Sequence, residues 1–211
     1  MIHELRTYTL YPGKLNAYLE FSKTIGRPVR GQDYGINLGY WTSEFGPLNQ
    51  IWHLWSYESL DERTRLRGEL AKNERWTKKY TPKVRPLMVR QDIRLLNPVY
   101  GVTPPEKGGG FYELRMYRMH PGMAAGWAKA YREIMPVREK YSKNVGIWTG
   151  EAPQPNEVFH MWNYPTFEAR TKARTDLFKD PAWLDFIAKN SGSIAEMNNV
   201  LLLPTDYSPM K

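Results

Sequence analysis

The feature that most constrains the fold is an internal repeat, because one pattern occurs twice within a chain of 211 residues. The stretch Glu4–Tyr8 returns as Glu113–Tyr117, and Ile51–Tyr57 returns as Val158–Tyr164. Self-similarity at a nearly constant spacing indicates a duplicated structural unit. We therefore expect two copies of one fold.

Each half predicts the element order strand, helix, strand, strand, helix, strand. In the first half we predict strands at residues 2–10, around Trp41, at 51–57 and at 88–96, with helices over 14–27 and after Ser59. This order is that of the ferredoxin-like βαββαβ unit, whose helices cover one face of a four-stranded antiparallel sheet. The predicted fold is therefore α+β, with two ferredoxin-like halves. We place the halves at residues 1–97 and 111–211, joined by a Pro/Gly-rich linker at 98–110.

Strict alternation along Ile51–Tyr57 separates two faces of the strand. On one face His53, Trp55 and Tyr57 return as His160, Trp162 and Tyr164, whereas the face with Trp52 and Leu54 keeps only its apolar character. A bare aromatic sheet face is a liability in water. We therefore expect the face with His53 to turn away from the helices, toward a second sheet, and Trp52 and Leu54 to lie beneath the helices.

The opening Ile2–Gly13 and the later His53–Tyr57 are similar to the NIPSNAP-type domain, and the resemblance covers both halves outside the linker. This family is placed in the dimeric α+β-barrel superfamily, which includes cofactor-independent monooxygenases, small isomerases and haem-dependent enzymes. The resemblance implies that the open faces of two sheets pack together. It implies no settled reaction and no set of catalytic residues.

Composition narrows the compartment and the site chemistry. A hydrophobic content of 41% and an aromatic content of 14% permit a packed core. The absence of cysteine excludes disulfides and thiolate sites and fits a reducing compartment. No signal-peptide pattern precedes the first strand, and no apolar run approaches membrane-spanning length. We therefore expect a soluble cytoplasmic protein without a membrane partner.

The repeated polar and aromatic residues are the candidate site. We expect a pocket between the sheets for a small aromatic or carboxylate ligand, lined by Arg6, Tyr8, Trp41 and Trp55, or by Arg115, Tyr117, Trp148 and Trp162. His53 and His160 are the candidate catalytic residues, as proton acceptors, because histidine titrates near neutral pH. Arg6 and Arg115 are the candidate anion partners. A polar network that only fixes strand register would produce the same pattern.

The four histidines offer no pair on one strand face, so neither a histidine-rich zinc site nor another metal site is expected. No cofactor is predicted, although haem ligation by a single histidine stays open. The activity could be monooxygenase- or isomerase-like, and whether the protein is an enzyme is left open at this stage.

Two other functions compete with small-molecule binding. One is an assembly or scaffold domain with a filled core. The other is a nucleic-acid module, since RNA-recognition domains share this element order and the net charge is +8. The third strand lacks the basic-Gly-aromatic-Gly pattern of that module. The basic excess falls between Arg63 and Arg94, where we expect a solvated helical surface and no nucleic-acid partner. Eight tryptophans leave much apolar surface to cover, which favours a homo-oligomer.

Overall fold

A computed structural model describes residues 1–105 and 109–211. Residues 106–108, which belong to the predicted linker, lie outside the described residues. The chain forms two compact units, one of Met1–Leu95 with Pro204–Lys211 and one of Leu96–Leu203. Each unit is described by itself.

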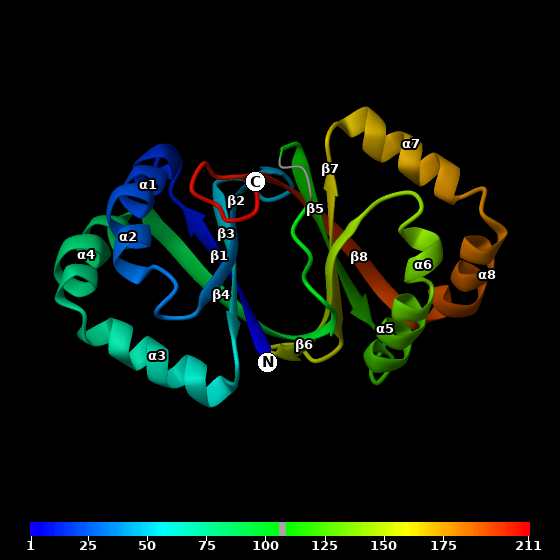
Figure 1. The fold of residues 1–211 in the computed structure, drawn as a ribbon, viewed down its shortest axis with the longest axis horizontal. Helices are drawn as coiled ribbons and strands as arrows, with labels where there is room; N and C mark the ends of the chain where they lie inside the picture. The colour runs from blue at the N-terminus through cyan, green and yellow to red at the C-terminus, as the bar shows by residue number, and fades with distance from the viewer. Residues whose placement is uncertain (106–108) are drawn as a thin grey trace. The chain divides into compact units, whose positions relative to one another are not determined.

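The first unit has strands with helices on one face of their sheet (Figure 1). Its elements are β1 (Ile2–Leu10), α1 (Leu15–Phe21), α2 (Arg27–Arg30), β2 (Ile36–Phe45), β3 (Gln50–Tyr57), α3 (Leu60–Lys72), α4 (Thr81–Val84) and β4 (Met88–Tyr100). Short π-helical turns at Ser22–Gly26 and Arg75–Tyr80 precede α2 and α4, and a 3-10 turn at Arg85–Leu87 precedes β4. In the sheet, β1 and β2 flank β3, and β4 adjoins the other side of β1.

The second unit repeats this order. Its elements are β5 (Phe111–Met119), α5 (Ala124–Glu133), α6 (Met135–Arg138), β6 (Asn144–Ala152), β7 (Glu157–Tyr164), α7 (Phe167–Leu177), α8 (Pro181–Asn190), a 3-10 turn (Ser191–Ser193) and β8 (Ile194–Pro204). The strand order is β8-β5-β7-β6, and β5 pairs antiparallel with both β7 and β8. The predicted α+β fold of two ferredoxin-like βαββαβ halves, of the dimeric α+β-barrel type, is confirmed.

The helix starts follow from the sequence signals. At α3 the Ser59 hydroxyl accepts a hydrogen bond from the Glu62 N–H at 3.0 Å. Thr166 caps α7 in the same way at 3.1 Å, and Asp180 caps α8 by accepting from the Ala182 N–H at 2.9 Å. Each side chain satisfies an N–H that has no partner in the first helical turn.

The first helical segment runs further than predicted. The π-helical turn at Ser22–Gly26 leads directly into α2, and Pro28 stands in the first turn of α2. The helical path therefore extends to Arg30, a buried residue. This extension matters for the site described below.

The segment Pro204–Lys211, which the sequence placed with the second half, packs in the first unit. The Thr205 N–H donates to the Tyr40 carbonyl at 2.9 Å, and the Tyr40 N–H donates to the Ser208 hydroxyl at 2.9 Å. Met210 is buried. The last residues therefore contribute backbone contacts to β2.

The predicted facing of the central strand is wrong. His53 lies on the face that packs against the helices, as does His160, whose Nδ1 lies 3.3 Å from the hydroxyl of Tyr131 in α5. The pocket expected between sheets lies instead between a sheet and its own helices. The physical reason is that the buried carboxylates of this face find their counter-charges on the helices, as the ion pair of Glu4 with Arg63 in α3 shows.

The basic segment between Arg63 and Arg94 is mainly solvated, as predicted. Eight of its eleven basic residues are exposed, and Arg63, Arg67 and Arg94 are half-buried. Among the helices in residues 1–105 and 109–211, none is long and apolar enough to cross a membrane.

Candidate functional site

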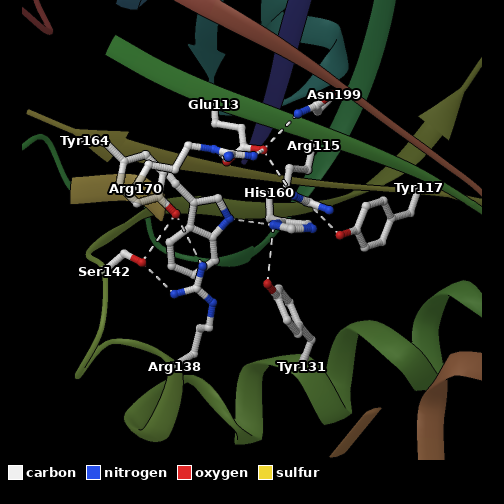
Figure 2. Close-up of polar contacts among 11 residues, drawn as sticks. Glu113, Arg115, Tyr117, Tyr131, Arg138, Ser142, His160, Tyr164, Arg170 and Asn199 are labelled. Carbon is white, nitrogen blue, oxygen red and sulfur yellow. Dashed lines mark hydrogen bonds and ion pairs between the residues drawn. The ribbon is translucent and has the colours of Figure 1, made fainter. Parts of the chain in front are cut away.

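A ladder of polar side chains stands on β5, on the face toward the helices. Glu113, Arg115 and Tyr117 occupy alternate positions, so their side chains share that face. The Arg115 guanidinium donates to the Glu113 carboxylate at 3.0 Å and to the Tyr117 hydroxyl at 2.7 Å. Arg170 of α7 donates two further hydrogen bonds to Glu113, each of 2.8 Å. These contacts hold Arg115 in a fixed position (Figure 2).

The Glu113 carboxylate is fully buried and ionised. Burial alone would raise its pKa, but hydrogen bonds from Arg170 and Asn199 and the charge of Arg115 outweigh burial and lower the pKa to about 2. The first unit repeats the arrangement, since Glu4 pairs with Arg6 at 2.8 Å and with Arg63. One carboxylate in each unit thus neutralises part of a larger positive cluster.

His160 lies directly opposite Arg115 on the neighbouring strand β7. Its Nδ1 accepts a hydrogen bond from the Trp162 indole N–H at 2.7 Å. Because an indole N–H can only donate, Nδ1 must be unprotonated, and the neutral ring carries its proton on Nε2. That Nε2 is buried and has no hydrogen-bond partner among the described residues.

The surroundings keep His160 neutral. Burial lowers its pKa well below the ordinary value, and the positive charges of Arg115, Arg138 and Arg174 lower it further. The sequence suggested a proton acceptor at this position. The tautomer instead leaves a buried N–H donor at Nε2.

Two arginines beside His160 lack a carboxylate partner within the described residues. Arg138, at the end of α6, lies over the Trp162 ring at 3.9 Å and donates to the Ser142 hydroxyl at 2.6 Å. Arg174 of α7 is half-buried and makes no hydrogen bond or ion pair with any described side chain. Burial lowers the pKa of Arg174, and the charge of Arg115 adds to that effect. An anion placed here would satisfy both guanidinium groups.

These groups surround a cavity of about 250 Å³ in the second unit. Its polar lining comprises Arg115, Tyr117, Tyr131, Arg138, His160, Arg174 and Ser191, and its apolar lining comprises Trp127, Leu177, Phe178, Trp183, Phe186, Ile187, Ile194 and Met197. None of the fifteen is an aspartate or a glutamate. The volume lies just below the roughly 300–1,000 Å³ of pockets that hold drug-sized ligands, so a ligand here would be small.

The first unit has an equivalent but smaller cavity of about 100 Å³. His53 accepts a hydrogen bond from the Trp55 indole at 2.5 Å, and its Nε2 also lacks a partner among the described residues. Burial lowers the pKa of His53 well below its ordinary value, with contributions from nearby arginines. The same tautomer is therefore present in both units.

The structure brings together most of the predicted site residues. The cavities are lined by Arg6, Tyr8 and His53 in one unit and by Arg115, Tyr117 and His160 in the other. Trp55 and Trp162 hold the histidines through hydrogen bonds rather than lining the cavities.

Trp41 and Trp148 do not line the cavities. Trp41 lies opposite Trp52 in the β2–β3 register, and Trp148 lies opposite Phe159. Residues directly opposite each other in antiparallel strands share a face. Both tryptophans therefore lie on the sheet face away from the histidines, and their prediction as pocket residues is wrong.

Several lining residues were missed from the sequence. They are Arg30 and Arg67 in the first unit and Tyr131, Arg138 and Arg174 in the second. The repeat contained a signal for the arginines, because Arg30 aligns with Arg138 and Arg67 with Arg174. Tyr131 gave no such signal, since Ser22 stands at the matching position of the first half.

The donor set is not that of a metal centre. Within residues 1–105 and 109–211, no group of three or more histidine, aspartate or glutamate side chains is placed to hold a metal ion. The cavities instead combine cationic and N–H donors with aromatic walls.

Comparison with known proteins agrees with the duplicated fold. The family model described as NIPSNAP matches residues 3–100 and again residues 112–209. Protein NipSnap homolog 3A from Homo sapiens is 30% identical over 217 residues, which cover 100% of this chain and 86% of that protein.

Two solved structures share the fold at low sequence identity. A candidate monooxygenase from Fusobacterium nucleatum matches 96% of this chain and 91% of its own, with a TM-score of 0.72 and 12% identity. A second candidate monooxygenase, from Lactobacillus acidophilus, matches 96% and 93% with a TM-score of 0.70 and 13% identity. At such identity the likeness concerns the fold alone. The two family matches, one for each half, show that this chain belongs to the NIPSNAP family.

Proposed function

We propose that the cavity of the second unit binds a small amphipathic anion, an aromatic or aliphatic carboxylate. The observation that carries this proposal is the buried, unpartnered Nε2–H of His160, which lines a cavity beside two arginines without a carboxylate partner. A buried donor without a partner costs about 1–3 kcal/mol. A ligand carboxylate would accept from this N–H and from Arg138 and Arg174.

The apolar half of the cavity determines the chemistry of the part of the ligand beyond its charged group. Trp127, Trp183 and Phe186 form an aromatic wall, with ring centroids of Trp183 and Phe186 5.2 Å apart. Burial of apolar ligand surface against such a wall contributes roughly 25 cal/mol per Å². We therefore propose a ligand with one charged end and one compact hydrophobic end.

The same donors would stabilise an enolate-like anion, which supports a cofactor-independent monooxygenase- or isomerase-like reaction as the finer proposal. Since Asp and Glu are missing from the lining, the donors can stabilise negative charge, and no carboxylate is at hand to remove a proton. Binding is therefore the part of the proposal that the geometry supports best. Scaffolding without a ligand is the alternative that the experiment must separate from it.

The test is a calorimetric and thermal-shift screen of matched pairs, phenylacetate against phenylacetamide and octanoate against octanol. Carboxylates should raise the apparent stability by mass action, by about 2.7 kcal/mol at a hundredfold excess over Kd. Arg174→Gln should weaken binding tenfold or more, because a charge-assisted hydrogen bond contributes about 1.5–3 kcal/mol.

The control is Arg118→Gln, which alters an exposed arginine of strand β5 that does not line the cavity. Carboxylates that stabilise wild type, Arg174→Gln and His160→Phe equally would refute the proposal, as would amides and alcohols that bind as well as the acids. Absence of binding by every compound of the screen would favour the scaffold alternative.

We also propose a cytoplasmic homo-oligomer that does not bind nucleic acid. Phe45 and Leu48, at the β2–β3 turn, are 64% and 67% exposed, which supports a contact between copies. Light scattering coupled to size-exclusion chromatography measures the mass in solution. Binding assays with single-stranded and duplex nucleic acid at several salt concentrations test whether the protein binds nucleic acid.

A further inference from the structure

The two cavities differ in which residues fill them. Tyr40 in the first unit and Ile147 in the second lie directly opposite the cavity histidine of their own unit. The Tyr40 ring stacks on His53, with centroids 4.4 Å apart and planes 1° apart. This ring occupies space that an isoleucine leaves open in the second unit.

A second exchange acts in the same direction. Tyr80 lines the first cavity and Ile187 the second, at positions 107 residues apart, as Tyr40 and Ile147 are. The Tyr80 hydroxyl lies 2.9 Å from the Ser22 hydroxyl, so it points to a polar partner. The first cavity, at about 100 Å³ against about 250 Å³, has therefore lost most of its room for an apolar ligand.

Both cavities are lined by cationic groups, but the first has less apolar space. Arg6, Arg30, Arg67 and Arg85 line the first cavity, and of these only Arg6 has an ion pair with a described residue. His53 and Arg30 are 1% and 3% exposed, and His53 Nε2 and Arg30 Nε lack hydrogen-bond partners among the described residues. No aspartate or glutamate lines this cavity.

We propose that the first-unit cavity is a separate binding site for a compact oxyanion without an apolar body, of the size of phosphate or oxalate. His53 Nε2–H and the Arg30 and Arg67 guanidinium groups are the donors that hold it. The duplicated units thus bind two different classes of anion. This inference rests on the residues of the first unit and does not depend on the ligand proposed for the second.

The first experiment is calorimetric titration of inorganic phosphate, and separately of oxalate, at constant ionic strength maintained with chloride. Wild type should bind at one site, and Arg67→Gln and His53→Phe should each weaken binding tenfold or more. The matched variants Arg174→Gln and His160→Phe, in the second unit, should leave it unchanged. Absence of binding to the wild type, or binding lost only in the second-unit variants, would overturn the proposal.

The second experiment exchanges the residues that distinguish the cavities. Ile147→Tyr should abolish octanoate binding to the second unit and leave phosphate binding intact. Tyr40→Ile should create an additional octanoate site in the first unit. If octanoate does not bind to the wild type, the result contradicts only the function proposed for the second unit. The first-unit proposal is tested separately, because phosphate binding is measured independently.

A spectroscopic reading covers the case in which a cavity variant fails to fold. In wild-type protein labelled with 15N-histidine, phosphate should shift the Nε2 resonance of His53 and not that of His160. The four histidines are assigned through their single variants. A phosphate response confined to His160, or to neither ring, would contradict the proposal.

Discussion

The indole ring of Trp148 folds back over Gly146, two residues earlier on β6, so closely that a β-carbon on Gly146 would lie 2.5 Å from the ring. Gly39 and Trp41 have the same relationship in the first unit, at 2.0 Å. Both tryptophans are buried, at 1% and 0% exposure, so neither ring can move aside freely. The glycine of each Gly-x-Trp is therefore required by the indole that follows it.

Gly146→Ala should destabilise the protein by about 1–3 kcal/mol, the usual effect of overpacking a filled core. The measurement is the urea midpoint of unfolding at unchanged m-value. Gly126→Ala is the matched control, because Gly126 is exposed in α5 and a β-carbon there would meet nothing within 4 Å. That control should gain about 0.5–1 kcal/mol. Equal stability of Gly146→Ala and wild type would contradict the packing described.

The hydrogen bond from Trp162 to His160 should appear as a coupling energy in a double-mutant cycle. His160→Phe leaves the Trp162 N–H without its acceptor, at about 1–3 kcal/mol. Trp162→Phe leaves His160 Nδ1 with the Tyr131 hydroxyl, at 3.3 Å, as its remaining hydrogen-bond partner among the described residues. The double variant removes both atoms and should be less destabilised than the sum of the singles by about 1–2 kcal/mol. Trp183→Phe is the control, since the Trp183 N–H has no partner among the described residues. Strict additivity of the two substitutions would show that the bond does not form.

Stability should fall as the pH drops from about 6.5 to 4.5. In this window the unfolded histidines gain protons, whereas the folded pKa values of His53 and His160 are well below 6.5 and that of His3 is about 4. The unfolded state therefore binds more protons, and each buried histidine subtracts about 1.4 kcal/mol per pH unit from the free energy of unfolding. Glu113 adds to the loss only below its ordinary pKa of 4.5.

Urea unfolding at several pH values measures this slope. The two substitutions His53→Phe and His160→Phe together should remove the part of the slope, of unfolding free energy against pH, that about two protons contribute. A slope that survives the double substitution would assign the effect to other groups.

Glu113→Gln should be strongly destabilising, because it leaves Arg115 and Arg170 without the carboxylate that they share. Removal of one partner from a buried ion pair costs about 3–5 kcal/mol. Glu196→Gln is the control, because Glu196 is about half exposed in its pair with Arg118 and should change stability by less than about 1 kcal/mol. Chemical denaturation of the two variants makes the comparison, and similar small losses in both would show that the buried network contributes little.

The order of elements could be predicted because the same sequence pattern occurs independently in both halves. The helix starts at Ser59, Thr166 and Asp180 are local features of the same kind, since capping depends on residues adjacent in sequence. Which face of β3 packs against the helices could not be predicted in this way. Alternation divides β3 into two sets of side chains, but both sets are apolar enough to be buried, and all but one residue of β3 are buried.

The residues that decide which face of β3 packs against the helices lie in the helices themselves. Arg30 and Arg67 had been aligned with Arg138 and Arg174, and a repeated arginine on a helix needs a polar surface to face. The prediction that Trp41 and Trp148 line the pocket failed because of strand register. Each follows a shift in strand register, after Asn37 and Asn144, and such bulges cannot be counted from alternation alone.

The return of Pro204–Lys211 to β2 has a consequence for the order in which the protein matures on the ribosome. The second unit is one continuous stretch, so it can complete its packing as soon as Leu203 has left the exit tunnel. The first unit is synthesised earlier, yet its Tyr40 backbone has to wait for Thr205 and Ser208, which are made later. Nascent domains usually mature from the N-terminus onward. Here the earlier unit is completed last.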